Sequence, residues 1–104
     1  MLSFKEQINE DLDVFFNLDE FGDTHSIDGM PRTVVIDNET LKERIRKEYD
    51  GILQADLLYF IKESDVFKKP KSGEMQNFDG CLYSVFDVKY DSGVYEIILQ
   101  GAMN

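Results

Sequence analysis

Two side chains that enzymes often use for chemistry occur once each in this sequence, at His25 and Cys81. His25 lies in a stretch rich in carboxylates, the groups that metal ions share with histidine: Asp19, Glu20, Asp23 and Asp28. One histidine with scattered carboxylates has neither the spacing of an EF-hand nor that of a zinc site. We therefore interpret the stretch as a solvated acidic connector, and an enzyme that binds a metal through Asp and Glu is the alternative.

Cys81 would need a neighbouring base to act as a nucleophile, and His25 is the only histidine in the chain. No further group in the sequence is placed to orient such a pair, so we expect Cys81 to be a core-facing thiol on a strand. A lone cysteine also excludes a disulfide within the chain, which fits a reducing compartment. The glycines occur singly, so there is no loop to cradle a phosphate. The sequence therefore predicts no catalytic residue, no cofactor site and no metal site.

The composition is that of one folded domain that covers residues 1–104 and carries a strong negative charge. Hydrophobic residues make up 42% of the 104 residues, which is enough to build a core without disulfides. The formal net charge of −10 disfavours direct, sequence-specific binding to nucleic acid, because phosphate backbones attract Lys and Arg. No apolar run approaches the roughly 18 residues of a membrane span, and residues 1–7 lack a signal-peptide core. We expect no membrane partner and synthesis in the cytosol.

The clearest structural signal is the Asp28-Gly29 pair inside the stretch 21–37, FGDTHSIDGMPRTVVID. Asp-Gly is the strongest short hairpin signal, since a type I′ turn needs a positive φ at both central residues. The return arm, 30–36, ends in β-branched residues that suit a half-buried strand. Pro31 cannot donate to a strand ladder and so belongs at a strand start or an edge. We predict an antiparallel hairpin here, with the rest of the chain arranged around it.

An amphipathic helix is predicted for 3–16, within an N-terminal segment of 1–17. Ser3 and Glu6 have the capping-box spacing, which satisfies free backbone N–H groups at a helix start. Apolar residues recur at steps of three and four and form one stripe: Phe4, Ile8, Leu12, Phe15 and Phe16. We expect this stripe to pack against a sheet of the same chain, with a subunit interface as the alternative.

The segment 38–50, NETLKERIRKEYD, interrupts the series of strands with a highly charged stretch. Leu41, Ile45 and Tyr49 lie four residues apart, so we predict a short helix or a loop that becomes ordered on binding. A solvated face is the default interpretation of the basic residues around them, and a docking element for an acidic surface is the alternative. In the second interpretation the contact residues are Leu41, Arg44, Ile45, Arg46 and Tyr49.

Four further strands are predicted after this segment, at 52–62, 74–78, 81–90 and 94–99. Asp79-Gly80 and Asp91-Ser92-Gly93 mark the turns between the last three, and the loop 68–73 carries Pro70. No crossover helices separate the strands, so a parallel sheet is not expected. The predicted fold is mainly β, and α+β by content. It is a small, meander-like antiparallel barrel of five to six strands over 24–100, preceded by the N-terminal helix.

The order of these elements resembles that of the small head–tail joining proteins of tailed bacteriophages and prophages, also called head completion or stopper proteins. The resemblance depends on an ordered string of segments that covers nearly the whole chain, with no single specific motif: FFNLDEFGDTHSIDG, VVID, LLYFIKESD, KPKSGE, FDGCLYSVFDV and DSGVYEIILQ. Members of this family have sometimes been labelled as sugar-transporter ATP-binding proteins. This sequence has no P-loop to support such an activity, so we reject that label here.

The resemblance implies a β-barrel with a helix that is monomeric in isolation and assembles as a ring on the portal or adaptor complex after DNA packaging. The ring would then present the surface to which the tail attaches through a tail terminator or tail completion protein, and some members close the channel. The implied protein is a structural part of the virion neck, made in the host cytoplasm, with no catalytic residues. By position, 38–50 corresponds to the family's long inter-strand loop, and such loops tend to become ordered on assembly.

An acidic protein-binding adaptor module with no role in the virion is the alternative function. Residues 1–28 hold eight acidic residues against one basic residue, Lys5, so this part of the chain could capture a basic partner. An interaction that disappears at modest salt, without assembly on a portal, would favour the module.

Overall fold

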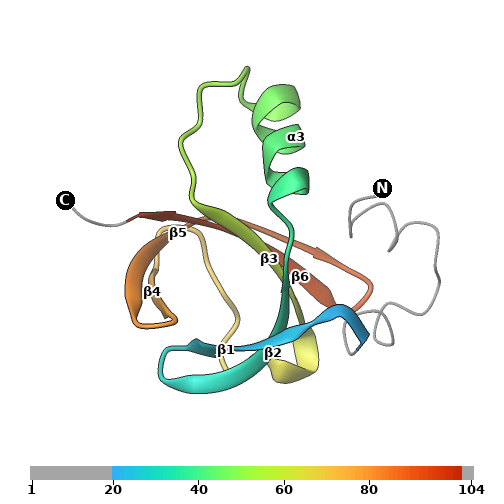
Figure 1. Ribbon diagram of the computed structural model, residues 1–104, viewed down its shortest axis with the longest axis vertical. Coiled ribbons are helices and arrows are strands. Elements are labelled where there is room, and N and C mark those ends of the chain that lie inside the picture. The colour runs from blue at the N-terminus through green and yellow to red at the C-terminus, as the bar shows by residue number, and fades with distance from the viewer. Residues whose placement is uncertain (1–19, 102–104) are drawn as a thin grey trace.

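The computed structural model describes residues 20–101, which form a closed barrel of six strands with one helix, α3, projecting from it (Figure 1). The elements follow in the order β1 (Asp23–Ile27), β2 (Met30–Ile36), α3 (Asn38–Glu48), β3 (Leu57–Lys62), the 3-10 turn η1 (Glu63–Asp65), β4 (Met75–Phe78), β5 (Cys81–Asp91) and β6 (Val94–Gly101). Every strand pairing is antiparallel. The small antiparallel barrel predicted from the sequence is confirmed.

Three tight turns connect the hairpins, and each has a positive φ at both central residues: Asp28 and Gly29, Asp79 and Gly80, and Ser92 and Gly93. A type I′ turn requires this backbone conformation, which glycine adopts without steric cost. The first two turns are the Asp-Gly pairs of the sequence, and the third lies within the predicted turn at 91–93. Local turn chemistry therefore sets the register of all three hairpins.

The strand order around the barrel is β1-β2-β3-β6-β5-β4, which differs from the simple meander that the sequence suggested. Strands β1 to β3 form one three-stranded meander, and β4 to β6 form another. The two meet where β3 pairs with β6 along its whole length, and they close the barrel where Ile27 of β1 lies opposite Phe78 of β4. The segment 63–74 makes this order possible, because it carries the chain from the end of β3 to a strand beside β1.

Strand β3 has apolar side chains on both faces, and each face contributes to a different core. Tyr59 and Ile61 belong to the inner core, which fills the barrel, whereas Leu58 and Phe60 belong to the outer core. Leu41 of α3 packs in the outer core, so the helix covers this outer face of the barrel. Burial of both faces explains the continuous apolar run LLYFI, which a strand with one solvated face would not need.

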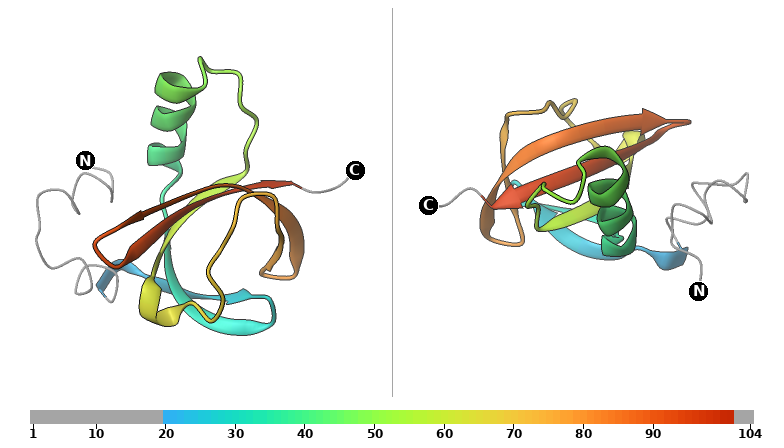
Figure 2. Two further views of the ribbon diagram at one scale, coloured as in Figure 1. Left: turned by 180° about the vertical axis from the view of Figure 1, so that it is seen from behind. Right: turned by 90° about the horizontal axis from the view of Figure 1, so that it is seen from above.

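The sequence predicted either a short helix or a loop for 38–50, and the structure shows the helix, α3. Asp37 caps its start, because its carboxylate accepts from the backbone N of Thr40 at 3.0 Å and from the Thr40 hydroxyl at 2.8 Å. Figure 2 shows the helix from two further sides, projecting from the barrel above β3. Its packed side is therefore fixed by the cap and by the outer core.

The strand predicted over 52–62 begins later, at Leu57. Asp50 and Gly51 adopt positive φ values of 52° and 75° as the helix ends, and the chain then returns to the barrel without forming a strand. Ile52 is 78% exposed in this loop, so its apolar character does not reflect burial in a sheet. The prediction failed because it took apolar content alone as evidence of strand pairing.

Cys81 is exposed, which corrects the expectation of a core-facing thiol. It is the first residue of β5 and lies opposite Phe78, directly beside the Asp79-Gly80 turn. On this strand Tyr83 packs partly buried against the inner core and Val85 is its first fully buried member, so Cys81 lies beyond the edge of that core. The predicted N-terminal helix, 3–16, lies outside the described residues.

Strand β5 contains a bulge at which its pairing with β6 shifts by one residue. Val85 lies opposite Leu99, but Asp87 rather than Phe86 lies opposite Ile98. Phe86 is the extra residue, and it packs against the outer core. Because of the bulge, the consecutive residues Phe86 and Asp87 both lie on the α3 side of the barrel.

Candidate functional site

Arg44 lies at the centre of a group of charged side chains between α3 and the barrel, although only 3% of its side chain is exposed. Its guanidinium donates to Glu48 (Nε to Oε2, 3.1 Å), to Glu96 (Nη1 to Oε2, 2.8 Å) and to Asp87. Lys89 lies 3.2 Å from the Glu48 carboxylate. These five residues, here called the Arg44 cluster, join α3 to β5 and β6.

In the Arg44 cluster, burial and ion pairing have opposite effects on the pKa of Arg44. Burial by itself would lower the pKa of Arg44, but the hydrogen bonds to Glu48 and Asp87 and the charge of Glu96 together hold that pKa above its ordinary value. In the other direction, the hydrogen bond from Arg44 lowers the pKa of Glu48. Arg44 and Glu48 are therefore both ionised at neutral pH, and the cluster fixes the helix on the barrel.

The five residues that were predicted to contact a partner differ in their burial. Leu41 and Arg44 are buried, at 4% and 3% exposure, so they hold α3 in place rather than facing solvent. Ile45 is partly buried against the outer core, and Tyr49 packs edge-on against Phe86 with ring centroids 5.5 Å apart. Of the five, only Arg46 is exposed. A contact through Arg46 stays a prediction, whereas Leu41 and Arg44 are assigned to folding.

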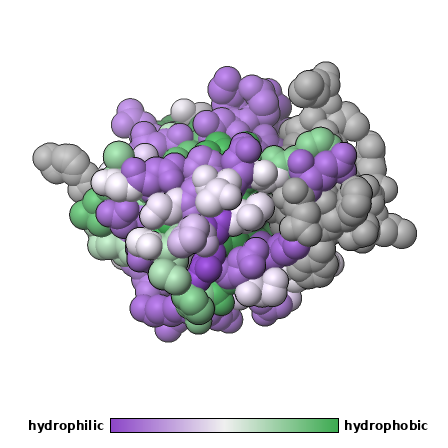
Figure 3. Space-filling view, turned by 60° about the horizontal axis from the view of Figure 1, so that its bottom comes forward, coloured by the Kyte–Doolittle hydropathy of each residue, from purple (hydrophilic) through white to green (hydrophobic). Residues whose placement is uncertain are grey.

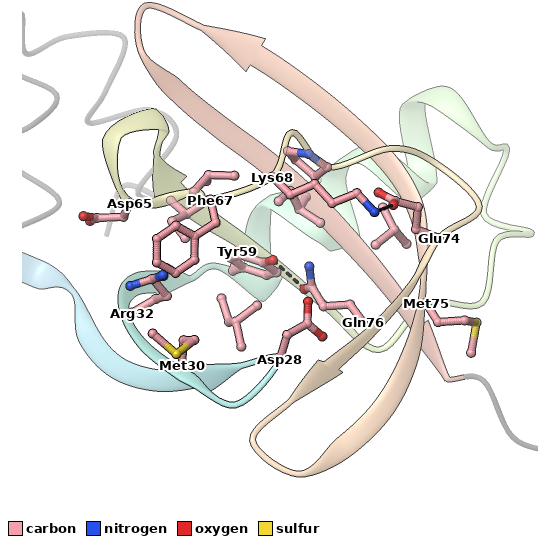
Figure 4. Close-up of a pocket in the computed structure, with 16 residues that line it drawn as sticks. Asp28, Met30, Arg32, Tyr59, Asp65, Phe67, Lys68, Glu74, Met75 and Gln76 are labelled. Atoms are coloured by element: carbon pink, nitrogen blue, oxygen red, sulfur yellow. Dashed lines mark hydrogen bonds and ion pairs between the residues drawn. The ribbon is translucent and has the colours of Figure 1, made fainter.

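A pocket opens into the barrel on the side away from α3, where the inner face of β2 extends past the core. Val34 belongs to the inner core, and Arg32 and Met30 follow it toward the turn in the same two-residue alternation. The pocket has a volume of about 240 Å³. Its lining combines inner-core side chains with polar ones: Ile27, Asp28, Met30, Arg32, Tyr59, Ile61, Asp65, Val66, Phe67, Lys68, Pro70, Glu74, Met75, Gln76, Val85 and Ile97. We call it the mouth pocket (Figure 4).

The floor of the mouth pocket carries one polar pair. The hydroxyl of Tyr59 donates to Oε1 of Gln76 at 2.6 Å, as Figure 4 shows by a dashed line. Tyr59 is 1% exposed, and this burial raises the pKa of its hydroxyl well above the ordinary value. Tyr59 is therefore neutral under physiological conditions and serves as a hydrogen-bond donor, not as an acid or base.

The rim of the mouth pocket carries an arginine stacked on an exposed aromatic ring. The guanidinium carbon of Arg32 lies 4.2 Å from the ring centroid of Phe67, and Phe67 is 81% exposed. On the other side of the opening, Lys68 lies 3.0 Å from Glu74, and this ion pair lowers the pKa of the Glu74 carboxyl. Figure 3 turns this end of the molecule forward and shows hydrophobic residues in small groups between hydrophilic ones.

The barrel closes beside the pocket through reciprocal contacts between two hairpin turns. Asp28 Oδ1 accepts from the backbone N of Asn77 at 2.9 Å, and Asp79 Oδ1 accepts from the backbone N of Ser26 at 2.9 Å. His25 Nδ1 lies 2.6 Å from Asp79 Oδ2, and this contact lowers the pKa of Asp79. We call this set of contacts the turn clasp. Because β1 and β4 share one paired position, the clasp stabilises the seam.

His25 thus contacts the carboxylate of Asp79, a residue distant in sequence from the acidic connector in which it lies. Among residues 20–101, no group of three or more His, Cys, Asp and Glu side chains is arranged to hold a metal ion. Asp19, another of the residues considered for such a site, lies outside this range. No helix within residues 20–101 is long and apolar enough to cross a membrane.

Sequence reasoning missed the mouth pocket, although part of the signal was present. Met30, Arg32 and Val34 alternate along one face of β2, so an inward-facing arginine near the turn could have been expected. The contribution of Tyr59 and Gln76 could not have been expected from the sequence, because it depends on which strands meet across the barrel.

Comparison with known proteins adds information on the fold. The chain is similar to a solved structure described as the ATP-binding sugar transporter-like protein from Salmonella typhimurium, with a TM-score of 0.50 and 16% sequence identity; the match covers 93% of this chain and 91% of that one. Likeness at this level of identity shows a shared fold alone. No family model matches the chain, and a search of curated proteins finds no match.

Proposed function

We propose that this chain is a structural virion protein that assembles as a ring on the portal or adaptor complex and joins the DNA-filled phage head to the tail. The observation that carries the proposal is the agreement between the observed small barrel with its helix and the fold implied by the resemblance to head–tail joining proteins. Its partners would be further copies of itself, the portal or adaptor protein, and a tail terminator or tail completion protein. It would act in the host cytoplasm during assembly and then in the virion neck.

The surface chemistry is compatible with a subunit that waits as a monomer. A net charge of −10 keeps free copies apart and away from the packaged genome. Contacts that are weak singly become strong in a ring, because each bound copy raises the effective concentration of the next. The barrel supplies a rigid body for such contacts, and most of the large apolar residues that it exposes lie at or next to the ends of strands.

We do not extend the activity named for the Salmonella protein to this chain. The P-loop, a glycine-rich loop with a lysine that cradles nucleotide phosphates, is absent from the sequence. The mouth pocket, at about 240 Å³, is also smaller than the roughly 300–1,000 Å³ of typical small-molecule sites.

The test of the proposal is to remove the protein from particle assembly. Without it, we expect DNA-filled heads and separate tails in electron micrographs, and added purified protein should restore joined particles. Purified protein mixed with portal complex should also add a ring to the portal in negative stain. Normal tailed particles made in the absence of the protein would refute the proposal.

A surface variant tests the role of α3 in joining. Arg46 is exposed, so Arg46→Glu should leave the fold intact while weakening contact with an acidic partner surface, and the yield of tailed particles should fall several-fold. Arg46→Lys is the matched control, because it keeps the charge. A variant at Arg44 would not serve, because this buried residue stabilises the fold.

The alternative is an adaptor that captures a basic protein through residues 1–28, which contain eight acidic residues and one basic residue. Its binding should weaken steeply between low and physiological salt, because exposed charges are screened. Salt-sensitive binding to a basic partner, combined with no assembly on a portal, would favour this function over the ring.

A further inference from the structure

The strand pairs that close the barrel differ greatly in length. Strand β3 is paired with β6 from Leu57 to Lys62, whereas β1 and β4, in the part of the chain that the structure describes, are paired at one position, Ile27 with Phe78. Figure 1 shows β4 meeting the β1–β2 hairpin near its turn. A sheet opens at the lowest cost where the fewest backbone pairs must separate, so the β1–β4 seam is the place to examine for local opening.

Most of the closure at this seam comes from contacts that solvent can reach. The backbone N of Asp79 donates to the carbonyl of Ser26 at 2.8 Å, and the backbone N of Asp28 donates to the carbonyl of Asn77 at 2.8 Å. The turn clasp adds its carboxylate contacts, which lie at exposed positions. Hydrogen bonds that are exposed to solvent mark regions of low local stability.

The alternation of hydrogen bonds separates the β1–β2 hairpin from the seam. Ile27 and Met30 flank a two-residue turn, so their backbones bond to each other, and by alternation the N–H of His25 also faces β2. The N–H of Ser26 faces the other way and donates to Asp79. The seam can therefore open while β1 stays paired with β2.

The same alternation holds on β4. Phe78 flanks the Asp79-Gly80 turn, so its N–H faces β5, whereas the N–H of Asn77 faces β1 and donates to Asp28. Each of the two strands thus carries amides that report on its own hairpin beside an amide that reports on the seam.

The β4 side of the seam is the fixed side. Phe78 is 3% exposed and packs against Tyr59, with ring centroids 5.1 Å apart, and Gln76 accepts from the Tyr59 hydroxyl at 2.6 Å. Strand β1, by contrast, adds to the inner core only the partly buried Ile27 among the residues that the structure describes. Opening would therefore move the β1–β2 turn away from β4 and leave β4 against the core.

The mouth pocket extends across this seam. Ile27 and Asp28 line it from the β1 side, and Met75 and Gln76 line it from β4. Figure 4 shows the side chains of Asp28 and Gln76 close together, although they come from different hairpins. Movement of the β1–β2 turn would therefore widen the pocket toward its buried wall, which includes Val85.

We propose that the barrel opens reversibly between β1 and β4 while its other strand pairs hold, and that this opening is the entrance to the mouth pocket. The turn clasp holds the entrance closed. A pocket of about 240 Å³ in the closed state is then the small form of a larger cavity. This inference does not depend on the proposed function.

Amide hydrogen exchange of the full-length protein, followed by NMR, tests the opening. Ser26 and Asn77 should show protection factors about tenfold lower than those of His25 and Phe78, because local opening frees only the amides that face the seam. Equal protection of Ser26 and His25 would mean that the hairpin and the seam open together, and it would overturn the proposal.

A matched pair of turn variants tests the clasp. Asp79→Gly removes the carboxylate but keeps a residue that adopts the φ of 53°, and Ser92→Gly makes the same change at a φ of 51° in a turn away from the seam. Asp79→Gly should lower the protection of Asn77 several-fold, although the acceptor of that amide, Asp28, is unchanged. Ser92→Gly should leave it unaltered. An Asn77 amide that responds equally to both variants, or to neither, would exclude the clasp as the closing device.

Thiol reactivity tests the entrance. In a Cys81→Ser background, Val85→Cys places a thiol in the buried wall of the pocket, and Val35→Cys places one in the outer core; the native residues are 2% and 8% exposed. Adding Asp79→Gly should raise the rate of reaction with an aromatic disulfide reagent about fivefold at Val85→Cys and leave the rate at Val35→Cys unchanged. An equal rise at both sites would indicate general unfolding, and no rise at Val85→Cys would show that the seam does not lead to the pocket. Either result would overturn the proposed entrance.

Discussion

Arg44 and Arg32 occupy contrasting environments in the same barrel. Arg44 is 3% exposed and lies among three carboxylates, which anchor α3 to the wall. Arg32 lies at the rim of the mouth pocket, stacked on the exposed ring of Phe67, and within residues 20–101 it forms no ion pair. One arginine is fully used by the fold, and the other keeps its charge available.

This contrast reverses the expectation from the sequence, which placed Arg44 on a solvated face, or in the alternative on a contact surface, and did not single out Arg32. Basic residues on an amphipathic segment indicate a charged face, but they do not indicate whether that face meets solvent or another part of the chain. Two of the three carboxylates that neutralise Arg44 come from Asp87 and Glu96, far away in sequence. A buried and satisfied charge thus points to stability, and an exposed, loosely held one points to recognition.

The largest expected effect is at Arg44. Arg44→Met removes the charge that neutralises three carboxylates, one of them on the buried Glu96, and should lower the free energy of unfolding by about 3–5 kcal/mol. Arg32→Met removes only an exposed stacking contact and should cost about 1 kcal/mol or less. Urea denaturation of the two variants compares them directly, and equal losses would remove the distinction between the two arginines.

The next largest effect contrasts two aliphatic residues, one in α3 and one in the loop that follows it. Leu41→Ala opens a cavity in the outer core and should cost about 2–3 kcal/mol, because Leu41 is 4% exposed. Ile52→Ala should change stability by no more than about 0.5 kcal/mol, since that side chain is 78% exposed. Thermal unfolding of both variants measures the difference. A large loss at Ile52 would show that its side chain contributes to folding despite its exposure.

A smaller effect is expected on the floor of the mouth pocket. Tyr59→Phe removes the hydroxyl that donates to Gln76 at 2.6 Å and should cost about 1 kcal/mol in the free energy of unfolding. Gln76→Glu is a useful companion, because it offers the Tyr59 hydroxyl a charged acceptor of nearly the same shape. If Tyr59→Phe is neutral, water reaches this pair and the floor of the pocket is wetter than its burial indicates.

The smallest effect concerns acid and the turn clasp. The hydrogen bond to His25 lowers the pKa of Asp79 in the folded protein, so the unfolded chain binds the proton more readily. The stabilisation is therefore present above the ordinary carboxyl pKa of about 4 and is lost as the pH falls through the lower folded value. Urea unfolding at about pH 5 and about pH 3 should show a smaller pH dependence for Asp79→Asn than for the unchanged protein. An unchanged dependence would exclude Asp79 as a contributor.

Much of the barrel was predictable, because its hairpins are encoded locally. The pairs Asp28-Gly29 and Asp79-Gly80 specify their turns by backbone conformation alone, and the strands beside them follow. The strand order was not predictable in the same way. Pairing of β3 with β6 joins residues such as Leu57 and Leu99, and no local signal records that contact.

The candidate site was less predictable than the fold for the same reason. Alternation on β2 places Arg32 on the inner face, but the pocket exists only because the segment 63–74 crosses to β4 beside β1. Ile52 misled the strand prediction, because an apolar residue on a projecting loop looks the same in sequence as one inside a sheet. Exposure, which only the structure shows, separates the two.

The bulge in β5 lets the strand carry one extra residue without changing the faces of its neighbours. Deleting Phe86 would leave Asp87 opposite Ile98 and Val88 opposite Ile97 in an unbroken ladder, so Asp87 would stay on the α3 side and keep its contact with Arg44. The outer core and Tyr49 would lose an aromatic contact. We therefore expect a chain without Phe86 to keep its barrel while α3 is held less firmly.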